Sequence, residues 1–270
     1  MRIPLFFTMC TCLALSACTI SSHNAGQMPE AKTASAILWK RTTAEYNAIT
    51  RQVYLLAEKR IRSLRQQERL PNSWAIVLDI DETIFNNSAY DMQRASQGLS
   101  WSYESWTTWV EKREATVIPG ASAFLRLVKH LGGKIALVTN RAEAHRAATN
   151  DNLKAWGLHF DYLLPMQEGK SNKTERWRWL TDKESLNIIM WIGDQSSDLP
   201  MLKQCQSSSA PSLFSEASDT GGAPLLMQFG EALEYPLNDG LRKSIENCAG
   251  SYYFVLPNPI YGGWSNNIWR

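Results

Sequence analysis

Ala75-Ile76-Val77-Leu78-Asp79-Ile80-Asp81-Glu82-Thr83 is the stretch that decides the fold of this chain. Its apolar first half ends at charged residues, which is typical of a strand buried on both faces of a parallel sheet. Open α/β sheets place their binding sites at the carboxyl ends of such strands. Asp79 and Asp81 would point to the same side of the strand, and burying two like charges is costly unless a cation lies between them. We therefore expect a hard, oxygen-liganded metal such as Mg²⁺, and an aspartate that attacks phosphorus.

The rest of the chain alternates between strand and helix patterns. We expect strands at residues 74–79, 134–138, 161–164, 187–192 and 252–256. We expect helices at residues 35–69, 103–112, 119–130, 142–156 and 173–181. This alternation predicts an α/β fold with a doubly wound parallel sheet. Right-handed crossovers would bring all the strand ends to one edge. Residues 85–118 show no clear strand and are expected to hold two short helices, and residues 203–224 are expected to be loop.

The N-terminus is expected to be a targeting segment. Arg2 is followed by an apolar stretch, residues 3–15, which is too short to span a bilayer as a mature helix. Leu15-Ser16-Ala17-Cys18 resembles the lipobox of bacterial lipoproteins, which implies cleavage before Cys18 and lipid on that residue. Several acyl chains would give stable anchoring. Thr19 follows Cys18, and no aspartate stands at that position. In Gram-negative lipoproteins this would imply sorting to the outer membrane. The alternative is an ordinary signal peptide with an incidental cysteine.

These patterns also predict the domain organisation. Residues 1–17 are the signal, residues 18–34 a polar tether, and residues 35–270 one folded domain. Within that domain, segments 35–70 and 86–118 are expected to form a smaller, mainly helical subdomain. The chain of 270 residues has a net charge of only +2 and no long basic stripe, which disfavours polymeric nucleic acid as a partner. Cys205 and Cys248 could form a disulfide in an exported protein or remain free, and the oligomeric state is left open.

Polar clusters follow the predicted strands or the helices next to them. They are Asp79/Asp81/Thr83, Thr139/Asn140, Lys170/Lys173 and Asp194/Asp198. Each kind of group has a use in phosphoryl transfer. One carboxylate attacks phosphorus, and a second gives a proton to the leaving oxygen and later takes one from water. Hydroxyl, backbone N–H and lysine groups stabilise the phosphoryl oxygens beside a divalent ion.

This ordered set resembles the haloacid dehalogenase superfamily of phosphohydrolases. An acid at position 81 fits a phosphatase, which must hydrolyse its covalent intermediate. Further segments resemble the bacterial class C acid phosphatases, the lipoprotein e type 5′-nucleotidases. They are residues 39–57, 79–90, 106–110, 138–141, 256–258 and 261–264. The resemblance implies a Mg²⁺-dependent acid phosphomonoesterase that acts on nucleoside monophosphates.

The resemblance also implies roles for single residues. Asp79 would be nucleophile and metal ligand, Asp81 the acid/base with its backbone carbonyl on the metal, and Asp194 the third protein ligand. Thr83 and Asp198 would support this site. Asp198 would orient either the groups around the metal or Lys173, rather than take part in the chemistry.

Other residues would bind the phosphate. Thr139 and Asn140 would bind its oxygens, and Lys173 best matches the family's lysine. Its spacing from Asp194 is one residue longer than usual, so Lys170 is an alternative. Arg141 could contact phosphate or cap the following helix, and we favour the structural role.

Aromatic residues could recognise a nucleoside base. Trp106 and Tyr261 lie in segments that resemble the family's aromatic clamp, although both could instead be core residues. We expect Trp109 to pack in the core or on the surface and Glu82 to be an acid at a helix start. Two other functions remain open: a phosphatase of the same fold acting on sugar phosphate or phosphotyrosine, and a non-catalytic surface lipoprotein.

Overall fold

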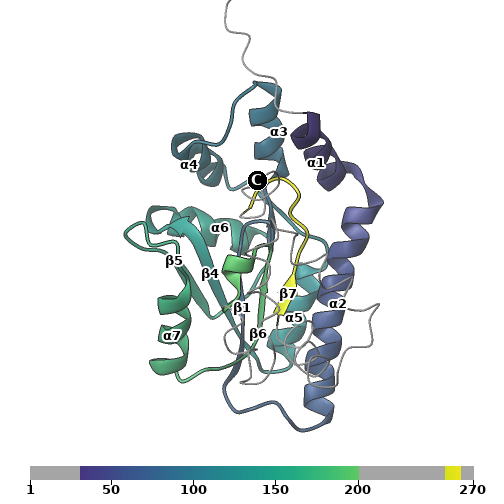
Figure 1. Ribbon diagram of the computed structural model, residues 1–270. Coiled ribbons are helices and arrows are strands. Elements are labelled where there is room, and N and C mark those ends of the chain that lie inside the picture. The colour runs from purple at the N-terminus through teal and green to yellow at the C-terminus, as the bar shows by residue number, and fades with distance from the viewer. Residues whose placement is uncertain (1–30, 201–252, 263–270) are drawn as a thin grey trace, which may run out of the picture.

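The computed structural model describes residues 31–200 and 253–262. Within these residues, five strands form one sheet in the order β5-β4-β1-β6-β7, and all neighbouring strands are parallel (Figure 1). The strands are β1 (Trp74–Leu78), β4 (Lys134–Ala142), β5 (Tyr162–Met166), β6 (Asn187–Gly193) and β7 (Tyr253–Val255). The predicted parallel α/β sheet is therefore confirmed. Cys18, Cys205 and Cys248 lie outside the described residues.

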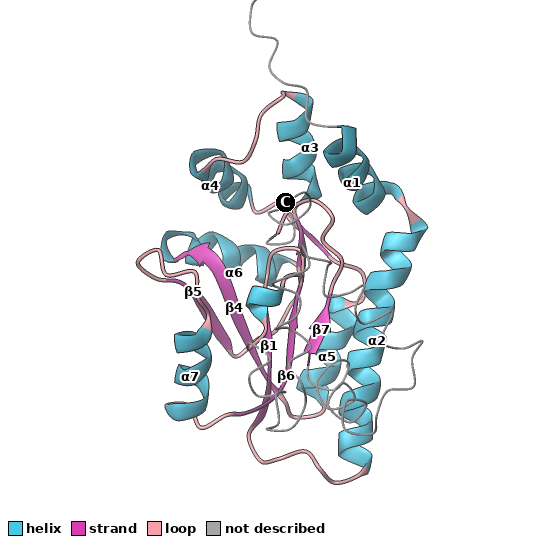
Figure 2. Cartoon of the chain, in the orientation of Figure 1, coloured by secondary structure: helices cyan, strands magenta, loops and turns pink. Residues whose placement is uncertain are grey.

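Helices cover both faces of this sheet, which explains the unbroken apolar run of β1. Ile76 and Leu78 face one hydrophobic cluster, together with residues of α2 (Ala44–Gln66) and α5 (Ala121–His130). Ala75 and Val77 face a second cluster with α7 (Thr174–Asp182). Figure 2 shows the strands between α7 on one side and α2 with α5 on the other. Successive residues of β1 point into opposite hydrophobic clusters, so every residue of this strand must be apolar.

The helix expected over residues 35–69 is in fact two helices, so that prediction is wrong. α1 (Ala31–Thr42) ends before Thr43, which has an extended backbone, and α2 then begins. The Thr43 hydroxyl accepts from the Tyr46 N–H at 3.2 Å and donates to the Trp39 carbonyl at 2.8 Å. A threonine whose side chain serves the backbone in this way caps one helix and interrupts the other.

Two further predictions are corrected by strand pairing. β4 continues to Ala142, which pairs with Met166, so the next helix does not begin at residue 142. A 3₁₀ turn (Glu143–His145) follows, and α6 spans Arg146–Ala155. The segment of residues 85–118 contains a small antiparallel pair, β2 (Phe85–Asn86) and β3 (Thr116–Val117). Strands of two residues are too short to show a periodic pattern.

Beyond the carboxyl ends of the strands lie α1, α3 (Ser88–Ser96) and α4 (Tyr103–Lys112) (Figure 1). α1 packs against α3, whereas α2 packs against α5 beside the sheet. The smaller subdomain built from segments 35–70 and 86–118 stays a prediction.

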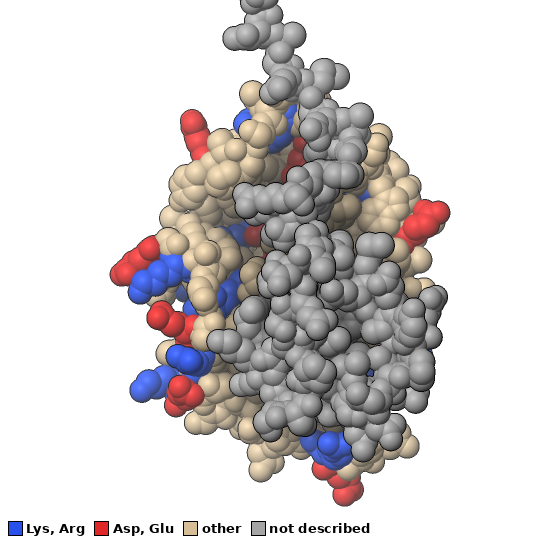
Figure 3. All heavy atoms as spheres, in the orientation of Figure 1, with Lys and Arg blue, Asp and Glu red and all other residues tan. Residues whose placement is uncertain are grey.

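The described surface carries charges of both signs. Figure 3 shows Lys or Arg and Asp or Glu groups side by side along the margin of the face in view. No helix among the described residues has the length and apolar character needed to cross a bilayer.

One partly exposed charge cluster ties α5 to the amino end of the sheet. Asp161 accepts hydrogen bonds from Lys129 Nζ at 2.8 and 2.7 Å, from Lys134 Nζ at 3.1 Å and from the Ile135 N–H at 2.9 Å. Burial alone would raise the pKa of Asp161, but these donors outweigh it and hold the pKa below the ordinary 3.8.

We expect Asp161→Asn to lower the free energy of unfolding by roughly 1–3 kcal/mol at pH 7, because a charged acceptor is lost. Since the folded-state pKa is depressed, the contribution is full above the unfolded pKa and disappears as pH falls through the folded one. Urea titrations at pH 7 and pH 3 should therefore show a larger difference from wild type at pH 7. Asp182→Asn, at an exposed site of α7, is the matched control. An equal difference at both pH values would contradict this account.

Candidate active site

A tight turn after β1 fixes the first two acidic residues of the site. The Asp79 N–H continues the sheet by donating to the Ile192 carbonyl at 3.0 Å. The Ile80 carbonyl then accepts from the N–H groups of Ile84 and Phe85, both at 2.8 Å. This turn leaves Asp79 at the strand end and carries Asp81 away from the strand direction.

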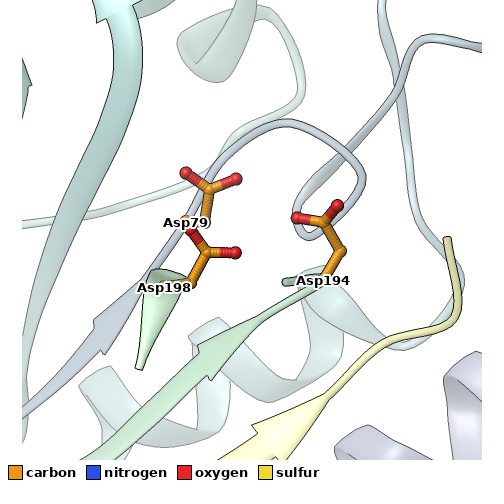
Figure 4. A group of neighbouring side chains, drawn as sticks. All are labelled: Asp79, Asp194 and Asp198. Atoms are coloured by element: carbon orange, nitrogen blue, oxygen red, sulfur yellow. The ribbon is translucent and has the colours of Figure 1, made fainter. Parts of the chain in front are cut away.

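Three carboxylates from separate parts of the chain meet at this edge of the sheet. Asp79 follows β1, Asp194 follows β6, and Asp198 lies on the 3₁₀ turn of residues 196–198 (Figure 4). Each offers an oxygen within 4.8 Å of the others, and each residue is at most 8 % exposed. Gly193 allows this approach, because a Cβ there would lie 2.3 Å from the Cβ of Asp198.

Lys173 supplies a positive charge to this cluster. Its Nζ lies 2.5 Å from Asp79 Oδ1 and 2.7 Å from Asp198 Oδ1, and the residue is 2 % exposed. Lys173 directly precedes α7, so the helix and its packing on the sheet fix the position of the ammonium group. Lys170, the alternative in the sequence, is exposed. Of the two lysines, the structure brings Lys173 to the site.

One ammonium does not offset three buried carboxylates. Burial raises the pKa of Asp79 to about 7, against the lowering effect of Lys173, and the charges of Asp198 and Asp81 raise it further. Burial, followed by the charges of Asp198 and Asp79, raises the pKa of Asp194 well above its ordinary value. Burial opposes the charge on Lys173, but the two aspartates outweigh it and raise its pKa. Such a surplus of buried oxygen ligands is the donor set that a hard divalent cation prefers, so these residues fit Mg²⁺.

Asp81 is not a member of this cluster, and the expectation that its carboxylate shares a cation with that of Asp79 is wrong. Arg141 Nε lies 3.1 Å from both Asp81 oxygens, and Nη2 lies 2.8 Å from Oδ1. Asn87 Nδ2 donates to the same Oδ1 at 2.8 Å. The cation beside Asp81 is therefore a guanidinium. Arg141 also donates to the Thr149 hydroxyl on α6. No side chain in the described part of the chain caps the start of α6, so the favoured prediction that Arg141 caps this helix is wrong.

The remaining predicted residues surround this centre. Asn140 lines the cavity beside Asp79, whereas Thr139 is buried behind it and its hydroxyl accepts from the Arg141 N–H at 3.1 Å. The Thr83 hydroxyl lies 3.5 Å from Asp194 Oδ1. The sequence did not reveal Arg176, which donates to the Asn140 Oδ1 at 2.8 Å and holds that side chain. An arginine in the first turns of a polar helix gives no signal of such a contact.

Glu82 is not an acid at a helix start. It is fully buried with a left-handed backbone (φ 59°), and its side chain binds residues of three other segments of the chain. Lys40 Nζ on α1 lies 2.5 Å from Oε1, and the Asn87 N–H donates to the same oxygen at 2.9 Å. Tyr261 from the C-terminal segment donates its hydroxyl to Oε2. Burial alone would raise the pKa of Glu82, but Lys40 and these donors lower it below the ordinary value.

A cavity of about 740 Å³ opens over the carboxylate cluster. Asp79, Asp81, Asn140, Arg141 and Lys173 line one end. Aromatic rings, among them Trp106 and Tyr261, line its walls. Trp106 packs edge-on against Tyr90, with ring centres 5.2 Å apart, and carries the Arg141 guanidinium 5.6 Å from its ring centre. Trp109 is buried and donates from Nε1 to Asn87, so the expected packing role of Trp109 is confirmed.

Comparisons with known proteins agree with this geometry. Residues 8–264 match the family described as HAD superfamily, subfamily IIIB (acid phosphatase). Acid phosphatase 1 of Solanum lycopersicum is 30 % identical over 130 residues, which cover 46 % of this chain and 51 % of that protein. The match thus spans about half the length of that relative.

Two solved structures of the class C acid phosphatase from Bacillus anthracis share the fold. The one with tungstate bound has a TM-score of 0.66 and 22 % identity, and covers 87 % of each chain. The other has a TM-score of 0.65 and 23 % identity, with the same coverage.

We expect Lys40→Met to destabilise the fold by about 3–5 kcal/mol, because it leaves the buried Glu82 carboxylate without its cation. Arg62→Met removes a cation from the partly exposed Glu58–Arg62 pair of α2 and should cost at most about 1 kcal/mol. Urea denaturation of both variants measures the difference. Adding Glu82→Gln to Lys40→Met should restore part of the lost stability. Equal losses in the two single variants would refute the importance of the buried pair.

Proposed function

This chain belongs to the acid phosphatases of HAD superfamily subfamily IIIB, and from that membership we propose that it hydrolyses phosphate monoesters, with nucleoside 5′-monophosphates as its substrates. The observation that carries the proposal is the meeting of Asp79, Lys173 and Asp194 at one end of a cavity that also contains Asp81 and Asn140. The groups that we propose as nucleophile, proton carrier and phosphate ligands thus surround one space.

We propose Mg²⁺ as the cofactor. Asp79, Asp194 and the backbone carbonyl of Asp81 would hold it, and the buried carboxylate surplus supports this assignment. When bound, the ion would neutralise charge on the phosphoryl oxygens and on the attacking carboxylate.

The proposed reaction has two steps on this chain's own residues. Asp79 attacks phosphorus, the bond from phosphorus to the ester oxygen breaks, and Asp81 gives that oxygen a proton. A water then attacks the aspartyl-phosphate and Asp81 takes its proton, which releases inorganic phosphate and restores Asp79. The two-point contact with Arg141 keeps the Asp81 carboxylate in one orientation for both transfers. Lys173 and Asn140 would stabilise the charge on the transferring group.

The nucleotide preference is supported by the walls of the cavity. Trp106 and Tyr261 both line the space next to the phosphate end. A hydrogen bond from the Tyr261 hydroxyl to Glu82 holds the Tyr261 ring in place. The Trp106 ring is held by its edge-on packing against Tyr90. A base stacked on a fixed ring gains about 1–3 kcal/mol with little demand on its identity. A sugar phosphate has no aromatic ring for such stacking, whereas phosphotyrosine has a smaller aromatic ring than a purine base.

We expect Asp79→Asn to abolish hydrolysis of both a chromogenic phosphate ester and adenosine 5′-monophosphate, because the amide cannot attack phosphorus. The variant should fold, since it removes one of three mutually repelling carboxylates, and circular dichroism and thermal melting check this. In wild type, a chelator should stop turnover and added Mg²⁺ should restore it. Full activity of Asp79→Asn would refute the nucleophile, and full activity in chelator would refute the metal.

We also propose that lipid on Cys18 anchors the protein to the bacterial outer membrane. This rests on the Leu15–Cys18 sequence alone, because these residues lie outside the described part of the chain. When the full chain is expressed in a Gram-negative bacterium, Cys18→Ser should move it from the detergent phase to the aqueous phase in a detergent partition assay. Cys205→Ser is the matched control and should stay in the detergent phase. A wild-type chain found wholly in the aqueous phase would overturn the anchor.

A further inference from the structure

The cavity extends from the phosphate end into a second region beneath α3 and the loop after that helix. Asp91, Arg94, Leu99, Trp101 and Trp106 line this space, which we call the leaving-group region. A phosphomonoester with phosphorus at Asp79 would extend the rest of its structure toward these residues. Leu99, Trp101 and Trp106 make this wall partly apolar, and its two charged residues are Asp91 and Arg94.

Of these two charged residues, Asp91 has an oxygen without a partner in the described part of the chain, whereas Arg94 is hydrogen-bonded. The Asp91 Oδ2 is buried, and it has no hydrogen-bond partner among the described residues. Two neighbouring cations are bound elsewhere: Lys40 Nζ lies 2.5 Å from Glu82, and the Arg94 guanidinium donates twice to the Ser100 carbonyl, at 2.8 and 2.5 Å. An unsatisfied buried acceptor is destabilising, and a donor brought into the cavity that Asp91 lines would offset this cost.

A purely structural role does not account for this geometry. Asp91 lies in the first turn of α3, where an acid interacts favourably with the helix dipole. An exposed carboxylate would serve that purpose equally well. Here, burial raises the pKa of Asp91 to about 7, and the negative charges of Glu82 and Asp81 contribute to the rise. The positive charges of Lys40 and Arg41 oppose it. The position therefore disfavours the ionised carboxylate.

We propose that Asp91 is a specificity-determining residue that accepts a hydrogen bond from an O–H or N–H group of the substrate's leaving group. The inference rests on the proposed phosphatase function and narrows its substrate class to esters with a donor remote from phosphorus. Nucleosides have such donors on the ribose and on the base, whereas a phenyl ester has none. A site built around a hydrogen bond discriminates strongly against analogues that lack the partner.

The test compares three substrates in four proteins. The substrates are adenosine 5′-monophosphate, its 2′,3′-dideoxy analogue and phenyl phosphate, and the proteins are wild type, Asp91→Ala, Asp91→Asn and the exposed control Asp182→Asn. The measured quantity is kcat/KM for adenosine monophosphate divided by kcat/KM for phenyl phosphate. We expect Asp91→Ala to lower this ratio by at least about tenfold, because the KM for adenosine monophosphate rises. Asp91→Asn keeps an acceptor oxygen and should lose less, and Asp182→Asn should keep the wild-type ratio.

The dideoxy analogue distinguishes the two sources of the donor. If the ribose hydroxyls donate, wild type should already disfavour the analogue; if the base donates, the analogue should behave like the ribonucleotide. An unchanged substrate ratio in both Asp91 variants would overturn the proposal, as would equal losses on all three substrates.

A binding measurement separates this inference from the proposed function. Calorimetry should show adenosine monophosphate binding at least about tenfold more weakly to Asp79→Asn/Asp91→Ala than to Asp79→Asn. If wild type hydrolyses none of the esters, the proposed function fails, while this comparison still tests Asp91. Equal affinities would overturn the role of Asp91 even in an active phosphatase.

Discussion

Mutual repulsion among three buried carboxylates is the constraint on which the arrangement of this site depends. Oxygens of Asp79, Asp194 and Asp198 come within 4.8 Å of one another where burial weakens the screening of their charges by water. Only a rigid scaffold can hold them there. The parallel pairing of β1 with β6 supplies it, because it brings residues far apart in the sequence to the same edge. Lys173 offsets part of the repulsion, and the remaining negative charge gives the site an affinity for a further cation.

The sequence predicted the parts of this site that depend on strand ends. One apolar run ends in Asp79 and another ends before Asp194. Because parallel strands in one sheet place their carboxyl ends together, these two runs were enough to predict that Asp79 and Asp194 lie close to each other. The order of the motifs then identified the family. The side-chain direction of Asp81 could not be predicted in the same way, because the strand stops at Leu78 and a turn sets the direction of the next residues.

Contacts between distant segments were the other part that the sequence could not reveal. Lys40 lies in the stretch expected to be one helix, and Glu82 was expected to be an acid at a helix start, yet the two form a buried pair 42 residues apart. Neither periodicity nor propensity carries information about such a partner. The break at Thr43 has a similar origin, because helical patterns on both sides concealed a cap that depends on two side-chain hydrogen bonds.

The same buried pair explains how segments outside the sheet contribute to the cavity. Glu82 comes directly after the two motif aspartates, and it binds Lys40 of α1, the start of α3 through Asn87, and the C-terminal Tyr261. The chemical groups and the cavity wall are therefore joined through one carboxylate. The strand ends fix the phosphate end, whereas α1 and α3 contribute residues to the opposite wall of the cavity. A substitution in that wall that keeps the contacts of Glu82 intact changes the space for the leaving group and leaves the reacting groups in place. This division lets one scaffold keep its chemistry while its substrate range varies.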